Sequence, residues 1–274
     1  MGKVTSVLSK KQIQWVRSLA IRKNRDREQA FIAEGPKVVG ELLNAGFECL
    51  FLAYTEEAAN ELSPHGPLLT LNSSLFTSIV SAQELSRLSQ LQTPQGVLAV
   101  FRIPAEPSAT LGTPPARGEM EGGFFSLLLD RVQDPGNVGT IIRLCDWFGV
   151  EDIFLSEGCA DPWAPKVVQA SMGALARVRV HTHVDAAKLC KTVRTQGLPV
   201  YACVLDGENI FQADLNPAGL IVLGNEGQGI SQEVLDQVSR RLTIPNYPPG
   251  RPTSESLNVA MAAAIVLAEF RRRM

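Results

Sequence analysis

The strongest constraint on the fold is the alternation of short apolar runs and helical segments in the second half of the chain. The runs "FFSLLLD" (124–130) and "GLIVLG" (219–224) are almost wholly apolar, which is typical of strands buried on both faces of a parallel sheet. Further strands are expected over 152–156, 177–184, 199–206 and 241–245, and helices over 137–149, 164–175, 185–197, 231–240 and 256–273. This order predicts an α/β fold whose parallel sheet is covered by helices on both faces.

The first part of the chain shows the same alternation on a smaller scale. Helices are expected over 10–21, 36–46, 74–80 and 82–90, and strands over 30–35, 48–55 and 96–103. Pro36 suits the first turn of its helix and Gly46 its end. These segments predict a small α/β domain.

A stretch rich in proline and glycine, "IPAEPSATLGTPPARGEMEGG" (103–123), separates the two parts. Such a composition buries little apolar surface and resists regular structure. We therefore expect a first domain over 1–104, a linker over 105–122 and a second domain over 123–274.

The net charge of the 274 residues is -2, from 28 acidic and 26 basic side chains, so the chain as a whole is no polycation. Residues 1–40 nevertheless hold nine Lys or Arg and only three acids. This basic stretch is either a solvated helix face or a contact for a polyanion.

Cysteine and histidine usage argues against a disulfide framework and a metal site. The five cysteines are odd in number and widely spaced, which indicates reduced thiols in a cytoplasm. His181 and His183 form an H-x-H pair without further ligands, so a surface strand is the expected setting. No signal peptide is evident, and the apolar run 259–268 is too short to span a membrane.

Three loops that follow expected strands carry the residue patterns of interest, because ligands of open parallel sheets bind beyond the carboxyl ends of the strands. The loop "GNEGQGIS" (224–231) superficially resembles a dinucleotide loop, but its order is G-x-x-G-x-G. It also lacks an acidic residue about twenty positions later. A tight strand-to-helix turn and a nucleotide-binding oxidoreductase remain alternatives for this loop taken alone.

Taken together and in order, "DRVQDPGNVGTIIR", "LIVLGNEGQGIS" and "LTIP…SESLNVAMAAAIVLAEF" resemble the three motifs of the SpoU-type (TrmH-like) RNA ribose 2′-O-methyltransferases of the SPOUT superfamily. The segments "RDREQAFIAEGPKVVGELL" and "TPQGVLAVF" resemble the domain that often precedes the catalytic one in that family. The motif positions are Asn137, Gly139, Arg143, Gly224, Glu226, Gly227, Ile244, Pro245, Ser256, Leu257 and Asn258.

The resemblance implies methyl transfer from S-adenosylmethionine to a ribose 2′-hydroxyl of tRNA or rRNA, without a metal. It also implies a C-terminal trefoil knot, a homodimer through the C-terminal domain, and an RNA substrate-binding role for the first domain. The cofactor would contact Leu223, Gly224, Ile244, Pro245 and Leu257, largely through backbone. The alternative is a nonenzymatic RNA-binding protein with a degenerate methyltransferase domain.

The implied catalytic residues are Arg143, Asn137, Glu226, Ser256 and Asn258. A helical wheel places Arg143 opposite the apolar face of its helix, where pairing with Asp146 is the structural alternative. The family's proposals make this arginine a base, whereas the permanent positive charge of a guanidinium favours a phosphate clamp.

The remaining expectations concern helix ends and RNA. Asn137 is expected to cap its helix and Glu226 to bind Asn137 or backbone amides, while Ser256 and Asn258 open the last helix. RNA contacts are expected at Arg22, Lys23, Arg25, Arg27 and Arg143. The connection "NYPPGRPTSE" (246–255) is longer than usual in the family and contains Pro248, Pro249 and Pro252.

Overall fold

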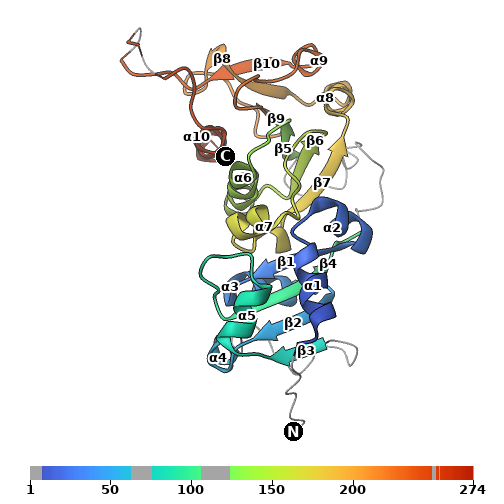
Figure 1. Ribbon diagram of the computed structural model, residues 1–274. Helices are drawn as coiled ribbons and strands as arrows, with labels where there is room; N and C mark the ends of the chain where they lie inside the picture. Colours follow the sequence, from blue (N-terminus) through green and yellow to red (C-terminus); the bar gives the residue numbers. More distant parts are fainter. Residues whose placement is uncertain (1–7, 63–75, 106–123, 249–250, 253, 274) are drawn as a thin grey trace. The chain divides into compact units, whose positions relative to one another are not determined.

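The computed structural model describes residues 8–62, 76–105, 124–248, 251–252 and 254–273 (Figure 1). The chain forms two compact units, one of Met1–Ala105 with Asp161–Arg177 and one of Glu106–Ala160 with Val178–Met274. The predicted α/β class with a parallel sheet is confirmed. Nearly all of the expected linker lies outside the described residues, and the predicted domain boundaries stay a prediction.

The first unit contains a four-stranded mixed sheet in the order β1-β4-β2-β3. Strand β4 is antiparallel to both β1 and β2, whereas β3 runs parallel to β2. Its elements are α1 (Lys10–Ser18), α2 (Arg22–Glu28), β1 (Ala30–Glu34), α3 (Pro36–Asn44), β2 (Cys49–Tyr54), α4 (Glu56–Leu62), β3 (Phe76–Ile79), α5 (Ala82–Leu88), β4 (Val97–Arg102), α7 (Pro165–Ser171) and a short 3-10 helix (Ala174–Ala176).

The helix expected over 74–80 was wrong, because this segment contains strand β3, which pairs with Phe51–Tyr54 of β2. A segment of seven residues is too short for a helical period to be told from an apolar strand. Its β-branched Thr77 and Ile79 favour the strand. Helices α2 and α4 were not expected.

Side chains of the first sheet alternate between two apolar layers, as the two-residue period of a strand requires. Ile32 of β1 joins a cluster with Val16 of α1 and Leu98 of β4. Phe31, its neighbour in sequence, lies on the other face, where its ring centroid is 4.8 Å from that of Trp163. The segment Asp161–Arg177 therefore completes the core of the first unit.

Arg25 fastens this segment through a buried ion pair. Only 3% of Arg25 is exposed, and its Nη2 and Nε donate to Oδ2 of Asp161 at 2.5 and 3.0 Å. Its Nη1 donates to the carbonyls of Leu19 and Ala20 at 2.7 and 2.8 Å. These bonds engage each nitrogen of the guanidinium, so Arg25 is part of the framework.

The second unit contains a six-stranded parallel sheet in the order β10-β8-β9-β5-β6-β7. Its elements are β5 (Phe125–Asp130), α6 (Pro135–Trp147), β6 (Asp152–Ser156), β7 (Arg179–Val184), α8 (Ala186–Thr195), β8 (Val200–Asn209), β9 (Gly219–Gly224), α9 (Gln232–Leu235), β10 (Arg240–Thr243) and α10 (Val259–Arg272). The strands 152–156 and 219–224 were predicted to the residue.

Three helices are shorter than expected. Helix α7 ends before Met172 and Gly173, which both adopt positive φ and break the helix predicted over 164–175. Helix α9 covers only four residues, and the side chain of Ser231 makes no capping hydrogen bond. Helix α10 begins at Val259, after Asn258 as its cap.

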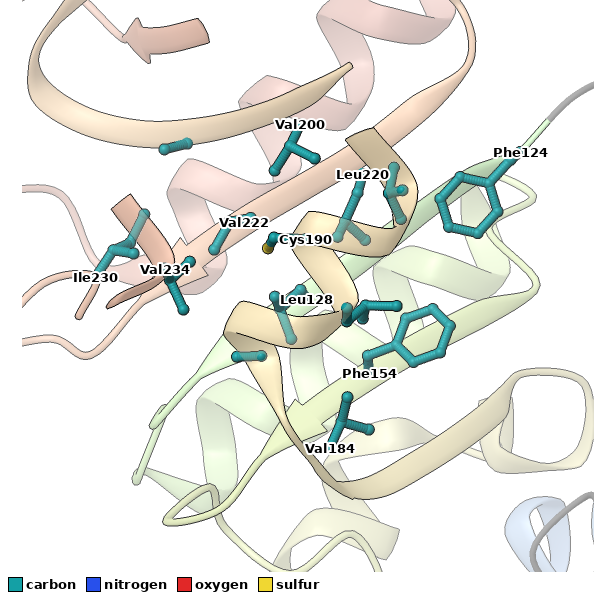
Figure 2. Close-up of a cluster of buried hydrophobic side chains, with 14 residues drawn as sticks. Phe124, Leu128, Phe154, Val184, Cys190, Val200, Leu220, Val222, Ile230 and Val234 are labelled. Carbon is teal, nitrogen blue, oxygen red and sulfur yellow. The ribbon is translucent and has the colours of Figure 1, made fainter. Parts of the chain in front are cut away.

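The sheet of the second unit is buried on both faces. Figure 2 shows Leu128 of β5, Val222 of β9 and Val200 of β8 packed with Cys190 of α8 and Val234 of α9. On the other face Phe270 of α10 packs against Phe125 and Tyr201, with ring centroids 5.5 and 5.1 Å apart. Burial on both faces explains why β5 and β9 are continuous apolar runs.

Helices α6 and α10 run side by side in the same direction and are tied at their carboxyl ends (Figure 1). Arg271 donates from Nε to the carbonyl of Phe148 at 2.6 Å and from Nη2 to that of Gly149 at 2.8 Å. Arg273 donates from Nη2 to the carbonyl of Phe211 at 2.8 Å. The arginines that end the chain therefore satisfy carbonyls left open at a helix end and a turn.

We expect Asp161→Ala to lower the free energy of unfolding of the first unit by about 3 kcal/mol or more, because it leaves the Arg25 guanidinium buried without a counter-charge. Glu48→Ala is the matched control. It removes an exposed carboxylate that binds Arg102 at 2.6 Å and should cost less than about 1 kcal/mol. Urea unfolding followed by tryptophan fluorescence measures both variants, and equal losses would contradict a buried anchor.

Candidate functional site

The three loops with the predicted motifs follow β5, β9 and β10 of the same parallel sheet. Strand β5 ends at Asp130 and β9 at Gly224, and these two residues are register partners. Strand β10 ends at Thr243 on the far side of β8. Since all six strands are parallel, the loops leave the sheet at its carboxyl edge, where ligands of such sheets bind.

The loop after β5 leads into α6 through Asp134, whose Oδ1 accepts a hydrogen bond from the backbone N–H of Asn137 at 2.8 Å. Asp134 is the cap and Pro135 the first helical residue, so the prediction that Asn137 caps this helix was wrong. Proline suits the first helical position because its φ is already helical. An N–H at this position would find no acceptor within the helix, so its absence in proline costs nothing. The Asn137 side chain is therefore left for other contacts.

Asn137 joins the three motifs. Its Nδ2 donates to Oε1 of Glu226 at 2.8 Å, and its Oδ1 accepts from Nδ2 of Asn258 at 2.9 Å. The side-chain oxygen of Asn258, Oδ1, caps α10 by accepting a hydrogen bond from the N–H of Ala260 at 2.9 Å. The predicted contact between Glu226 and Asn137 is present, and we name Asn137, Glu226 and Asn258 the amide–carboxylate junction.

The loop after β9 is folded around Asn225, which the sequence reading missed. Asn225 and Gly229 exchange backbone hydrogen bonds of 3.0 and 2.9 Å, and Oδ1 of Asn225 accepts from the N–H of Gly227 at 2.9 Å. Its Nδ2 donates to the carbonyl of Arg131 at 2.8 Å and so links this loop to the one after β5. An asparagine that follows an apolar strand and precedes two glycines is typical of a turn, and this pattern could have identified Asn225.

Asp130, also missed, is a buried carboxylate beneath these loops with 2% of its surface exposed. Its Oδ2 accepts from the N–H of Ser231 at 2.7 Å, and its Oδ1 accepts from Oγ of Ser156 at 3.3 Å. The carboxylate thus ties the loops after β5, β6 and β9 together. A charged residue that ends a fully apolar strand signals such a role.

The residues predicted to contact a cofactor line the carboxyl edge unevenly. Leu223 is buried with 2% exposure, so it can offer only backbone, whereas Leu257 is 49% exposed. Gly224 and Ile244 are half-buried and Pro245 is exposed. Thr243 at the end of β10 is a neighbour that was not predicted, and its Oγ1 donates to the carbonyl of Leu205 within β8 at 3.2 Å.

Arg143 and Ser256 lie outside the amide–carboxylate junction. Arg143 is exposed on α6, as predicted. Ser256 is exposed and precedes the cap of α10, so its predicted place inside the helix start was wrong. Asn258 takes the capping position instead.

The basic residues predicted to contact RNA divide into two kinds. Arg22, Lys23 and Arg27 are exposed on α2. Arg25 on the same helix is buried against Asp161, so a phosphate cannot reach it without breaking the first unit. Its assignment as an RNA contact is therefore corrected to a structural one.

Among the residues that the structure describes, the cysteines, His181 and His183 do not form a metal-binding group. Burial raises the pKa of the Cys159 thiol, whose Sγ contacts the carbonyl of Leu129 at 3.3 Å. His181 lies on β7, as expected for the H-x-H pair, and contacts Asp152 at 2.7 Å. Among the described residues no group of three or more metal-binding side chains occurs, and no helix is long and apolar enough to cross a membrane.

Fold and site together define a class of protein: a parallel α/β domain with three polar loops joined at the carboxyl edge, combined with a small α/β unit. Residues 125–268 match the SpoU rRNA Methylase family, and residues 10–99 match the MRM3-like substrate binding domain. The chain belongs to the SpoU rRNA methylase family, and the resemblance noted in its three motifs is confirmed.

Individual relatives resemble nearly the whole chain. The 23S rRNA (guanosine(2553)-2′-O)-methyltransferase RlmP of Bacillus subtilis is 28% identical over 277 residues, 99% of this chain and 100% of that protein. A structure assigned to the TrmH family of RNA methyltransferases, from Porphyromonas gingivalis, is 42% identical, with a TM-score of 0.82, and covers 98% of this chain and 100% of its own. An AdoMet-bound rRNA methyltransferase from Sinorhizobium meliloti is 27% identical, with a TM-score of 0.82, and covers 100% and 99%.

We expect Gly224→Ala to destabilise the second unit by about 1–3 kcal/mol, because an added Cβ would overlap the backbone carbon of Gly229 and lie 2.5 Å from the nitrogen of Ile230. Gly227→Ala is the control, since the atom nearest to its added Cβ is Oδ1 of Asn225 at 3.7 Å. Thermal unfolding of both variants tests this difference. A Gly224→Ala protein as stable as Gly227→Ala would show that the loop adapts.

Proposed function

We propose that this chain transfers a methyl group from S-adenosylmethionine to the ribose 2′-hydroxyl of a nucleotide in RNA. The observation that carries the proposal is the amide–carboxylate junction, in which Asn137 joins Glu226 and Asn258 from three separate motifs. Family membership and the names of the relatives support the reaction type. They also support S-adenosylmethionine as the cofactor, since the neighbouring structure from Sinorhizobium meliloti contains it.

The carboxyl edge has the character that an adenosine-bearing cofactor needs. Leu223 is buried and Gly224 has no room for a side chain, so backbone groups would make the contacts there. Ile244, Pro245 and Leu257 add apolar surface at the ends of β10 and before α10. When bound, S-adenosylmethionine supplies a methyl group already activated by its sulfonium.

Arg143 is assigned to the RNA side of the reaction. It is exposed on α6, about two helical turns beyond Asn137, so its charge can reach a phosphate. A guanidinium keeps its proton in proteins, which favours binding a phosphate and polarising the hydroxyl over removing the proton as a base. We assign Asn137, Glu226 and Asn258 to orienting the ribose, with Ser256 at the rim.

The substrate assignment is ribosomal RNA, with tRNA as the alternative, because the relative from Bacillus subtilis is named for 23S rRNA. The first unit would bind this RNA, with Arg22, Lys23 and Arg27 as phosphate contacts on α2. The exposed positions of these cations support that role. We also propose a cytoplasmic location, supported by the likeness over the whole chain to the rRNA methyltransferase of a bacterium.

We further infer a trefoil knot in the C-terminal part and a homodimer through it. The insertion of β9 between β5 and β8 supports the knot, since β9 follows β8 in sequence. Met261 of α10 is 60% exposed and Leu257 is 49% exposed, and this apolar surface supports a dimer. Sedimentation velocity checks the dimer, and a monomer at micromolar concentration would contradict it.

Mapping of 2′-O-methyl groups in total RNA from cells with and without the gene tests the proposed reaction. We expect one site in ribosomal RNA to lose its methyl group in the deletion strain and to regain it on complementation. Loss of a tRNA site would correct the substrate. An unchanged map would support the RNA-binding alternative without catalysis.

We expect Arg143→Ala to lower kcat by at least about a hundredfold while the Kd for S-adenosylmethionine stays within about twofold, because the arginine acts on the RNA. Arg194→Ala on α8, which removes an exposed arginine whose Nη2 donates to Gln237, is the matched control. Transfer of a radioactive methyl group to rRNA measures kcat. Near-normal turnover by Arg143→Ala would exclude both roles considered for this residue.

A further inference from the structure

The connection between β10 and α10 presents an aromatic ring that the fold does not use. Tyr247 is 88% exposed, more than Leu257 at 49% in the same connection. An exposed tyrosine ring leaves much apolar surface in water. Its position therefore calls for a binding partner.

The residues on either side of Tyr247 take part in hydrogen bonds. Nδ2 of Asn246 donates to the carbonyl of Arg251 at 3.2 Å, and the N–H of Arg251 donates to the carbonyl of Pro248 at 3.2 Å. Pro248 also fixes its own φ. Asn246 and Pro248, the two neighbours of Tyr247, are thus restrained by these contacts, which lowers the entropy lost when a ligand binds the ring.

Both ends of this connection belong to the candidate site. Tyr247 follows Pro245, a proposed cofactor contact, by two residues, and the connection returns to Asn258 in the amide–carboxylate junction. The ring therefore stands at the rim of the carboxyl edge. A polymeric substrate extends beyond its reacting nucleotide and must cross such a rim.

We propose that Tyr247 stacks on an unpaired base of the RNA substrate next to the nucleotide that is methylated, and so positions the acceptor ribose. This inference rests on the proposed function. Unpaired bases are recognised by stacking on aromatic rings, and a stack tolerates any base because each has a π-face. Tyr247 is a positioning residue here and takes no part in the chemistry.

The test compares Tyr247→Ala with Tyr247→Phe, which keeps the ring. Phe211→Ala is the matched control, because Phe211 is a 48% exposed aromatic of the same unit whose carbonyl binds Arg273 at the other end of α10. The probes are a fluorescein-labelled single-stranded RNA oligonucleotide containing 4-thiouridine and unmethylated 23S rRNA made by transcription. Fluorescence anisotropy gives the Kd, and methyl transfer gives KM and kcat.

Tyr247→Ala should raise the Kd and the KM for RNA by about fivefold to a hundredfold, while Tyr247→Phe and Phe211→Ala stay within about twofold of the unaltered protein. The Kd for S-adenosylmethionine and the sedimentation coefficient should not change. Ultraviolet cross-linking of the 4-thiouridine RNA should label the peptide that contains Tyr247. A role confined to stability would not produce that cross-link.

Unchanged RNA binding by Tyr247→Ala in a protein that methylates RNA would overturn the stacking proposal and leave the proposed function intact. If binding of the oligonucleotide depends on Tyr247 but the protein transfers no methyl group, the stacking proposal is upheld and the proposed function is contradicted. A changed sedimentation coefficient of Tyr247→Ala would assign the ring to an interface between copies of the chain and overturn the proposal as well.

Discussion

The carboxamide of Asn137 is the contact on which the site depends. One small side chain uses its donor for Glu226 and its acceptor for Asn258, and Asn258 in turn fixes the start of α10. Loops that are far apart in sequence are thereby held in one arrangement. Below them the buried Asp130 performs the same task through Ser156 and Ser231. Each layer thus uses one carboxylate, Glu226 or Asp130, as an acceptor for hydrogen bonds from other loops.

The pair of helices α6 and α10 also helps to hold the site in place. Their amino ends meet through Asn137 and Asn258, and their carboxyl ends meet where Arg271 binds the carbonyls of Phe148 and Gly149. Phe270, next to Arg271, anchors the carboxyl end of α10 to the sheet. The spacing of the two helices is thus fixed at both ends, and Arg143 projects from a helix that cannot shift easily.

Sequence patterns were sufficient for the sheet of the second unit, since a buried parallel strand such as 219–224 has a composition that few other settings allow. They also identified the three motifs and the contact of Glu226 with Asn137, but not Asn225 and Asp130, which hold the loops together. The assignment of Asn137 as a cap failed because Asp134 and Asn137 are both good caps, and only the proline between them decides. Arg25 was misassigned because its partner Asp161 lies far away in sequence, and an exposed arginine and a buried one look alike in a basic stretch.

The segment Asp161–Arg177 interrupts the second unit in sequence but belongs to the first in space. Asp161 and Trp163 complete the first unit through Arg25 and Phe31. A gene fragment cut at the proline-rich stretch would therefore encode a first unit with an unneutralised arginine and a second fragment with an orphaned tryptophan. Neither half is a transferable module. Recombination between family members would have to exchange the two pieces of the first unit together, so substrate recognition and catalysis are expected to diverge as one inherited block.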